Sequence, residues 1–167
     1  MKHRIAWTIA FAFLTLGLAA SASAQGLHPC SIARVEGDWG YSLQGTFLVP
    51  PSGTAVPVSF VGTLNVDWRG HVFGKQTSNA GGAVTKDVLV GTITVNTDCT
   101  GTFVVDIFDE SGATLRRSAV WALVFVNNAR EMRGTFESLI AKPSNTPVPA
   151  IAIANGKKLA GANSQED

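Results

Sequence analysis

The stretch that most constrains the fold is GTITVNTDCTGTFVV, residues 91–105. Apolar and polar residues alternate strictly over 91–96, which is the pattern of a strand with one buried face. A polar cluster then ends at Gly101, and residues 102–108 form a second run that is apolar on both faces. The stretch therefore predicts two antiparallel strands joined by a short turn.

The same period-two alternation recurs along the rest of the chain, and helical periodicity is confined to the first 24 residues. We expect strands over residues 37–49, 56–68, 72–74, 84–95, 102–108, 114–126 and 131–137, with an edge strand over 147–153. The fold class predicted is all-β, a single antiparallel up-and-down β-barrel of about 7–8 strands, with a β-sandwich as the alternative. Five Gly-Thr pairs that precede large apolar residues favour the barrel, because strand glycines permit the bends that close a sheet.

Asn127-Asn128 predicts a two-residue turn between the sixth and seventh strands, because asparagine tolerates positive φ. This turn would place Trp121 opposite Gly134, with Leu123 facing Met132 and Ala119 facing Phe136. The other face of strand six would show an apolar stripe, Val120 to Val126, to water. We expect the segment 148–159 to fold across this stripe, with a second copy of the protein as the alternative cover.

The N-terminus has the three parts of a secretory signal peptide: a basic start, an apolar run over 5–18 and the small residues Ala22-Ser23-Ala24. The run is shorter than the roughly 20 apolar residues of a membrane span. We therefore expect a signal peptide over 1–24, one barrel domain over 25–160 and a disordered tail over 161–167. The mature protein would be secreted or periplasmic, with no membrane span.

The formal net charge is +1, and two of its cations lie in the signal peptide, so the mature chain carries 1 − 2 = −1. No basic run is present, which argues against nucleic acid as a partner. Cys30 and Cys99 are the only cysteines, and in an exported chain such a pair predicts a disulfide. The disulfide would attach the N-terminal segment to the turn before Gly101 and stabilise the fold by about 4 kcal/mol at most.

Three motifs together resemble a family. Gly-Thr-Ile-Thr-Val-Asn-Thr-Asp-Cys-Thr-Gly at 91–101 occurs with Gly37-x-Trp39-Gly40-Tyr41 and with the run 124–128, Val-Phe-Val-Asn-Asn. This combination resembles uncharacterised small exported bacterial proteins that look like calycin or allene-oxide-cyclase-like barrels. The resemblance implies a fold and a compartment, and it implies no catalytic residue.

Several aromatic rings fall on strand faces that point inward. They either fill the lumen or line a pocket for a small apolar ligand. The residues are Trp39, Tyr41, Phe60, Phe73, Phe103 and Trp121. Asp106 either pairs with Arg116 or Arg117 on the sheet surface or lies in the lumen and orients the ligand.

Asp67 and His71 flank a turn and could act as a base with its orienting carboxylate. The alternative is that Asp67 binds its own turn and His71 is solvated. No nucleophile, metal-ligand spacing or cofactor motif accompanies them, so the sequence nominates no catalytic residue, metal or cofactor. The leading hypothesis is a non-enzymatic exported barrel that binds a small apolar ligand or acts structurally at the cell envelope. The alternative is a barrel enzyme of the isomerase or cyclase kind.

Overall fold

The computed structural model describes residues 29–160, and the expected signal peptide and C-terminal tail lie outside this range. One helical turn, α2 (Ile32–Val35), precedes the strands. The strands are β1 (Gly37–Val49), β2 (Thr54–Val66), β3 (His71–Ala80), β4 (Ala83–Val95), β5 (Thr100–Asp109), β6 (Leu115–Val126), β7 (Glu131–Ala141), β8 (Thr146–Pro147) and β9 (Ala150–Lys158).

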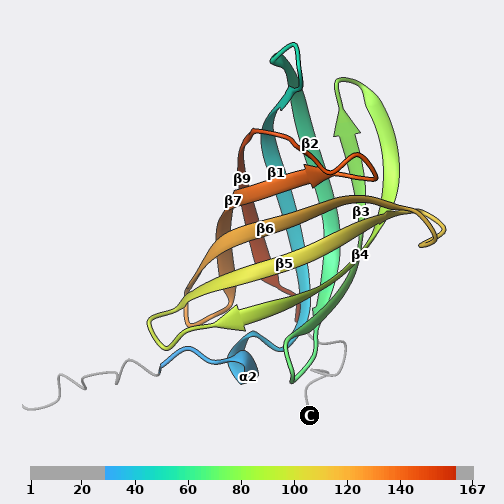
Figure 1. Cartoon of the computed structure of the whole chain (residues 1–167). Helices are drawn as coiled ribbons and strands as arrows, with labels where there is room; N and C mark the ends of the chain where they lie inside the picture. Colours follow the sequence, from blue (N-terminus) through green and yellow to red (C-terminus); the bar gives the residue numbers. More distant parts are fainter. Residues whose placement is uncertain (1–28, 161–167) are drawn as a thin grey trace, which may run out of the picture.

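Eight of the described strands form a closed antiparallel barrel (Figure 1). β1 to β7 each pair with the next strand in the chain, and β9 pairs with both β7 and β1. The short β8 pairs only with the end of β7, outside the ring. The up-and-down barrel predicted from the alternation is thus confirmed.

The C-terminal segment corrects one prediction. Residues 150–158 neither form an edge strand nor cover strand six, because they are the eighth strand that closes the ring. Ala152 and Ala154 face the lumen, while Ile151 and Ile153 point outward and are 74% and 64% exposed. Small inward residues suit this position, since β9 must pack between β1 and β7 where large rings already occupy the lumen.

The turn between β6 and β7 corrects the predicted register. Asn127, Asn128 and Ala129 all have positive φ, and the turn takes four residues instead of two. Pairing therefore shifts by two over 121–126, so that Leu123 faces Gly134 and Trp121 faces Phe136, and a further register shift between Val120 and Trp121 makes Ala119 face Leu139 instead of Phe136. A shift of two leaves every side chain on its predicted face, and Trp121 and Leu123 are indeed buried.

Strand three is longer than the alternation suggested. β3 continues through residues that read as a polar loop, and the turn falls at Gly81-Gly82, which both have positive φ. Gln76 and Ser78 occupy lumen-facing positions and are buried at 6% and 2% exposure. Gln76 and Ser78, which lie beyond the expected strand over 72–74, are thus part of the barrel interior.

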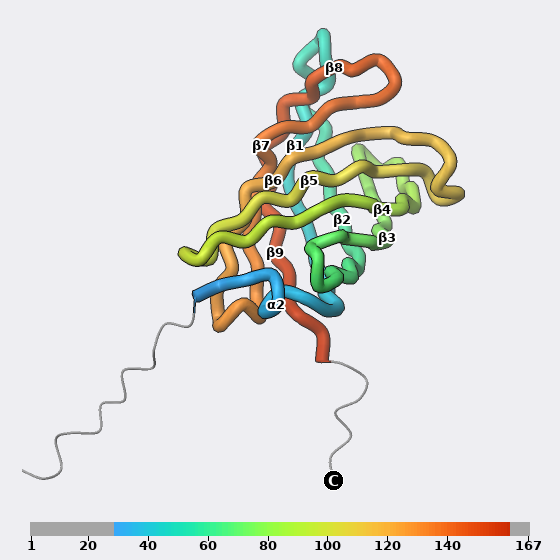
Figure 2. The backbone as a smooth tube through the Cα atoms, turned by 60° about the horizontal axis from the view of Figure 1, so that its bottom comes forward, coloured from blue at the N-terminus to red at the C-terminus, as the bar shows by residue number. Residues whose placement is uncertain are grey.

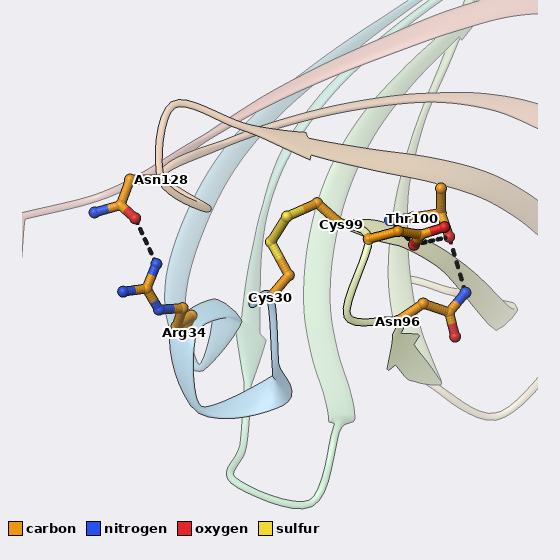
Figure 3. The surroundings of a disulfide bond; sticks show 7 residues. Cys30, Arg34, Asn96, Cys99, Thr100 and Asn128 are labelled. Carbon is orange, nitrogen blue, oxygen red and sulfur yellow. Dashed lines mark hydrogen bonds between the residues drawn. A yellow bond between two sulfur atoms is a disulfide. The ribbon is translucent and has the colours of Figure 1, made fainter. Parts of the chain in front are cut away.

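The lower end of the barrel is closed by the N-terminal segment (Figure 2). Val35 of α2 is fully buried, and its carbonyl accepts a hydrogen bond of 2.7 Å from the indole of Trp39. The Cys30–Cys99 disulfide joins this segment to the β4–β5 turn, with 4.9 Å between the two Cα atoms (Figure 3). Arg34 adds a hydrogen bond to Asn128 in the β6–β7 turn. The predicted attachment of this segment is confirmed.

Two strand glycines show why the Gly-Thr pairs suit a small barrel. A Cβ on Gly62 would lie 2.3 Å from the carbonyl oxygen of Lys75, and one on Gly91 would lie 2.2 Å from that of Val104. Neighbouring strands approach too closely there for any side chain. Glycine is therefore required at these two points of close strand approach.

Candidate functional site

The lower half of the lumen is entirely apolar. Trp39 is 1% exposed and meets Phe125 edge-on, with 6.2 Å between ring centroids. Val35 and Val72 pack beside them at 0% exposure. Trp39 therefore fills the closed end. It does not line the lumen cavity, so its assignment as a possible ligand-lining residue is wrong.

The middle of the lumen holds a cavity of about 40 Å³. Four of the predicted aromatic residues line it, namely Tyr41, Phe60, Phe103 and Trp121. Trp121 also contacts Phe136 with ring centroids 3.7 Å apart. Pockets for drug-sized ligands measure roughly 300–1,000 Å³, so side chains fill most of this barrel.

A cluster of buried polar side chains lies above this cavity. We call Tyr41, Gln76, Ser78, Asp87 and Arg117 the lumen polar cluster. Asp87 Oδ2 accepts hydrogen bonds from Gln76 at 2.9 Å, from Ser78 at 2.5 Å and from Arg117 Nη2 at 2.9 Å. The hydroxyl of Tyr41 donates to Gln76 Oε1, which links the cluster to the cavity wall.

Strand pairing explains how these residues meet. Gln76 of β3 lies directly opposite Asp87 of β4 in the sheet. Arg117 comes from β6 and reaches across the lumen, where its guanidinium lies 5.5 Å from the centre of the Phe60 ring. The cluster therefore ties together strands that are not neighbours in the sheet.

The electrostatics of the cluster follow from its burial. The side chain of Asp87 is fully buried, whereas that of Arg117 keeps 19% exposure. Burial lowers the pKa of Arg117, and the carboxylate of Asp87 acts in the opposite direction. Burial, assisted by the charge of Asp87, raises the pKa of Tyr41. The cluster thus holds one internal charge pair and keeps the phenol neutral.

The buried groups satisfy one another, with one exception. Arg117 Nε is buried and has no hydrogen-bond partner among the described residues. The hydroxyls of Ser78 and Tyr41 donate to other members of the cluster and are not paired with a histidine base. This arrangement holds charge in the interior and does not present an activated nucleophile.

Asp106 does not lie in the lumen. It is exposed on the outer face of β5, where its carboxylate accepts a hydrogen bond of 2.6 Å from Ser118. The expected partners Arg116 and Arg117 are displaced because the β5–β6 register shifts between Ile107 and Phe108. Arg117 is thereby directed into the lumen, opposite Ile107.

Asp67 and His71 adopt the arrangement of a turn. Asp67 Oδ1 accepts from the backbone amides of Arg69 and His71, and Oδ2 lies 2.9 Å from His71 Nδ1. Desolvation acts to raise the pKa of Asp67, but the hydrogen bonds from His71 and Arg69 lower it overall. Gly70 takes the expected left-handed conformation, with φ of +86°. This pair stabilises its own turn at the surface.

Sequence reasoning missed Asp87 and Gln76 as interior residues. The period-two alternation was the signal that could have found them. Gln76 and Ser78 lie on the same face of β3 as the buried Val72, and Asp87 lies on the same face of β4 as the buried Leu89. The sequence prediction places Ser78 in a polar loop and Asp87 in the strand over 84–95, and it assigns neither of them to the lumen.

The described part of the chain contains no group of three or more His, Cys, Asp or Glu side chains placed to hold a metal ion. No helix within residues 29–160 is long and apolar enough to cross a membrane. Comparison with known proteins finds no family model, curated relative or solved structure that matches the chain.

Proposed function

We propose that this protein is an exported, non-enzymatic β-barrel that acts as a structural or interaction module at the cell envelope. The observation that supports this function is the filled lumen, whose cavity of about 40 Å³ is far smaller than a pocket for a drug-sized ligand. A disulfide that closes one end of the barrel is typical of proteins in oxidising compartments. Activity would then reside on the outer face.

Titration of the mature protein with dodecanoic acid and with benzene tests this proposal. We expect no saturable binding of either compound, measured by calorimetry. Trp121→Ala provides the positive control, because an enlarged apolar cavity admits small aromatic molecules. Trp68→Ala is the matched control, since Trp68 is 64% exposed on a turn. Saturable binding of dodecanoic acid to the wild-type protein would overturn the proposal.

A second candidate function is binding or isomerisation of a small apolar molecule in the lumen. It is favoured by the hydroxyl of Tyr41 and the amide of Gln76, which provide polar groups at an otherwise apolar cavity wall. Binding that occurs in the wild type and is lost in Tyr41→Phe would favour this candidate over the first. Retention of the binding by Trp68→Ala would show that the loss is specific.

A further inference from the structure

The outer face of β1–β4 carries a hollow of about 580 Å³, which we call the outer groove. Strand register builds it from two adjacent rows of outward side chains. Asp38, Asn65 and Phe73 lie side by side in one row, because Asp38 pairs with Asn65 and Asn65 with Phe73. Gly40, Thr63 and Lys75 form the next row in the same way.

The groove has a floor and two apolar walls. Gly40 offers no side chain, so Leu159 packs over it and forms one wall, with Leu159 Cδ2 3.3 Å from the position that a Cβ would take. Leu159 is held there by the hydrogen bond from its amide to the Asp38 carbonyl, at 2.8 Å. Phe73 stands two strands away, roughly 10 Å across a sheet of ordinary strand spacing. Phe73 lies near the start of β3 on its outer face, where its ring is 57% exposed, so the prediction that it points inward is wrong.

Polar groups line the same hollow. The Asp38 carboxylate accepts a hydrogen bond of 2.8 Å from the Asn65 amide, which fixes both side chains at the rim. Lys75 has no ion-pair partner within residues 29–160. Thr63, which pairs with Lys75 in the sheet, adds a hydroxyl to the lining of the groove. One carboxylate and one ammonium leave the groove without net charge.

We propose that the outer groove binds a neutral oligosaccharide. A pyranose ring has an apolar C–H face, which suits the exposed face of Phe73, because an aromatic face carries partial negative charge. Its hydroxyl rim both donates and accepts, which suits Asp38, Asn65, Thr63 and Lys75 together. A wholly apolar occupant would desolvate these polar groups without compensation. A nucleic acid would require several more cations.

This inference rests on the proposed function and supplies its partner class, a glycan of the envelope. The probes are cellohexaose, laminarihexaose and maltohexaose, titrated into the mature protein by calorimetry and by NMR of the backbone amides. We expect saturable binding of at least one, with amide shifts centred on residues 63–65 and 73–75. Binding should persist at high salt, because no net charge is involved.

Variants locate the binding. Phe73→Ala should weaken it at least tenfold, while Phe73→Trp should retain it because a flat ring remains. Lys75→Ala should weaken it several-fold. Val124→Ala is the matched control, because Val124 is an exposed apolar residue on β6, three strands from Phe73 in the sheet, and should change affinity less than twofold.

The inference is overturned if none of the three probes binds saturably, or if Phe73→Ala binds as well as the wild type. The anionic polysaccharide polygalacturonate is titrated as a charged comparison. The inference is also overturned if polygalacturonate alone binds and high salt abolishes that binding, since the ligand would then be recognised by charge. These outcomes leave the proposed function standing as long as the lumen excludes dodecanoic acid. Conversely, a lumen that binds dodecanoic acid refutes the proposed function whatever the outer groove does.

Discussion

The two halves of the barrel lumen are stabilised by different interactions. The lower half is sealed by α2, the Cys30–Cys99 disulfide and an apolar cluster around Trp39. The upper half is crossed by Asp87 and Arg117, with Gln76 and Tyr41 completing the cluster. Apolar burial is insensitive to pH, whereas a buried charge pair depends on both partners being present and ionised. We therefore expect the two halves to respond differently to substitution and to pH.

The largest effect should come from the lower half. Trp39→Ala removes a fully buried ring and its hydrogen bond to Val35, and we expect a loss of about 3–5 kcal/mol in the free energy of unfolding. Urea denaturation followed by circular dichroism measures this loss. Trp68→Ala, on an exposed turn, should stay within about 0.5 kcal/mol. Similar losses for the two variants would show that the lower end is not a packed core.

Removal of the disulfide should cause the next largest loss of stability. Cys30 and Cys99 are 69 residues apart, and opening such a loop in the double variant Cys30→Ala/Cys99→Ala should cost about 2–4 kcal/mol. Thiol titration of the unfolded, unreduced wild type should detect no free thiol. Two reactive thiols there would contradict the disulfide, and an unchanged denaturation midpoint in the double variant would mean that α2 seals the barrel without it.

Substitutions in the upper half should lower the free energy of unfolding somewhat less. Asp87→Ala leaves the guanidinium of Arg117 without its partner, and we expect a loss of about 2–3 kcal/mol, moderated because Arg117 retains contact with water. The double variant Asp87→Leu/Arg117→Met replaces both charges with apolar groups of similar size and should recover most of that loss. A double variant as unstable as Asp87→Ala alone would show that Gln76 and Ser78, rather than the charge pair, carry the stability of the cluster.

The smallest effect concerns Tyr41, the single tyrosine of the chain. Burial raises the pKa of its phenol in the folded state above the ordinary value near 10. The folded protein then binds the proton more tightly than the unfolded chain does. The stabilisation is complete below about pH 10, and the free energy of unfolding declines as pH rises through and above that value.

Phenolate absorbance measures this directly, since Tyr41 alone contributes. We expect no phenolate signal in the folded protein at pH values where the urea-unfolded protein already ionises. Tyr41→Phe should lose about 1 kcal/mol at neutral pH, the contribution of one hydrogen bond, and should show a weaker decline in alkali. Ionisation of the folded and unfolded forms at the same pH would place Tyr41 in contact with solvent.

The fold class, the positions of several turns and the disulfide could be predicted from local sequence. Alternation along the chain predicted seven of the eight ring strands, because a half-buried strand must present a different polarity to each face. Two cysteines in the whole chain permit only one intramolecular disulfide. Gly70 and Asn127 marked turns because only certain residues accept positive φ readily.

Tertiary structure alone decided which polar residues enter the lumen. The alternation assigns residues to one of two faces, but Gln76, Ser78 and Asp87 are polar on the inner face, where their hydrogen bonds to one another and the ion pair with Arg117 compensate their burial. Arg117 reaches Asp87 from two strands away, and a register shift between β5 and β6 makes that possible. β9 closes the ring by pairing with β1, over a hundred positions earlier in the chain. Such partners are set by closure of the whole sheet, and no local pattern encodes them.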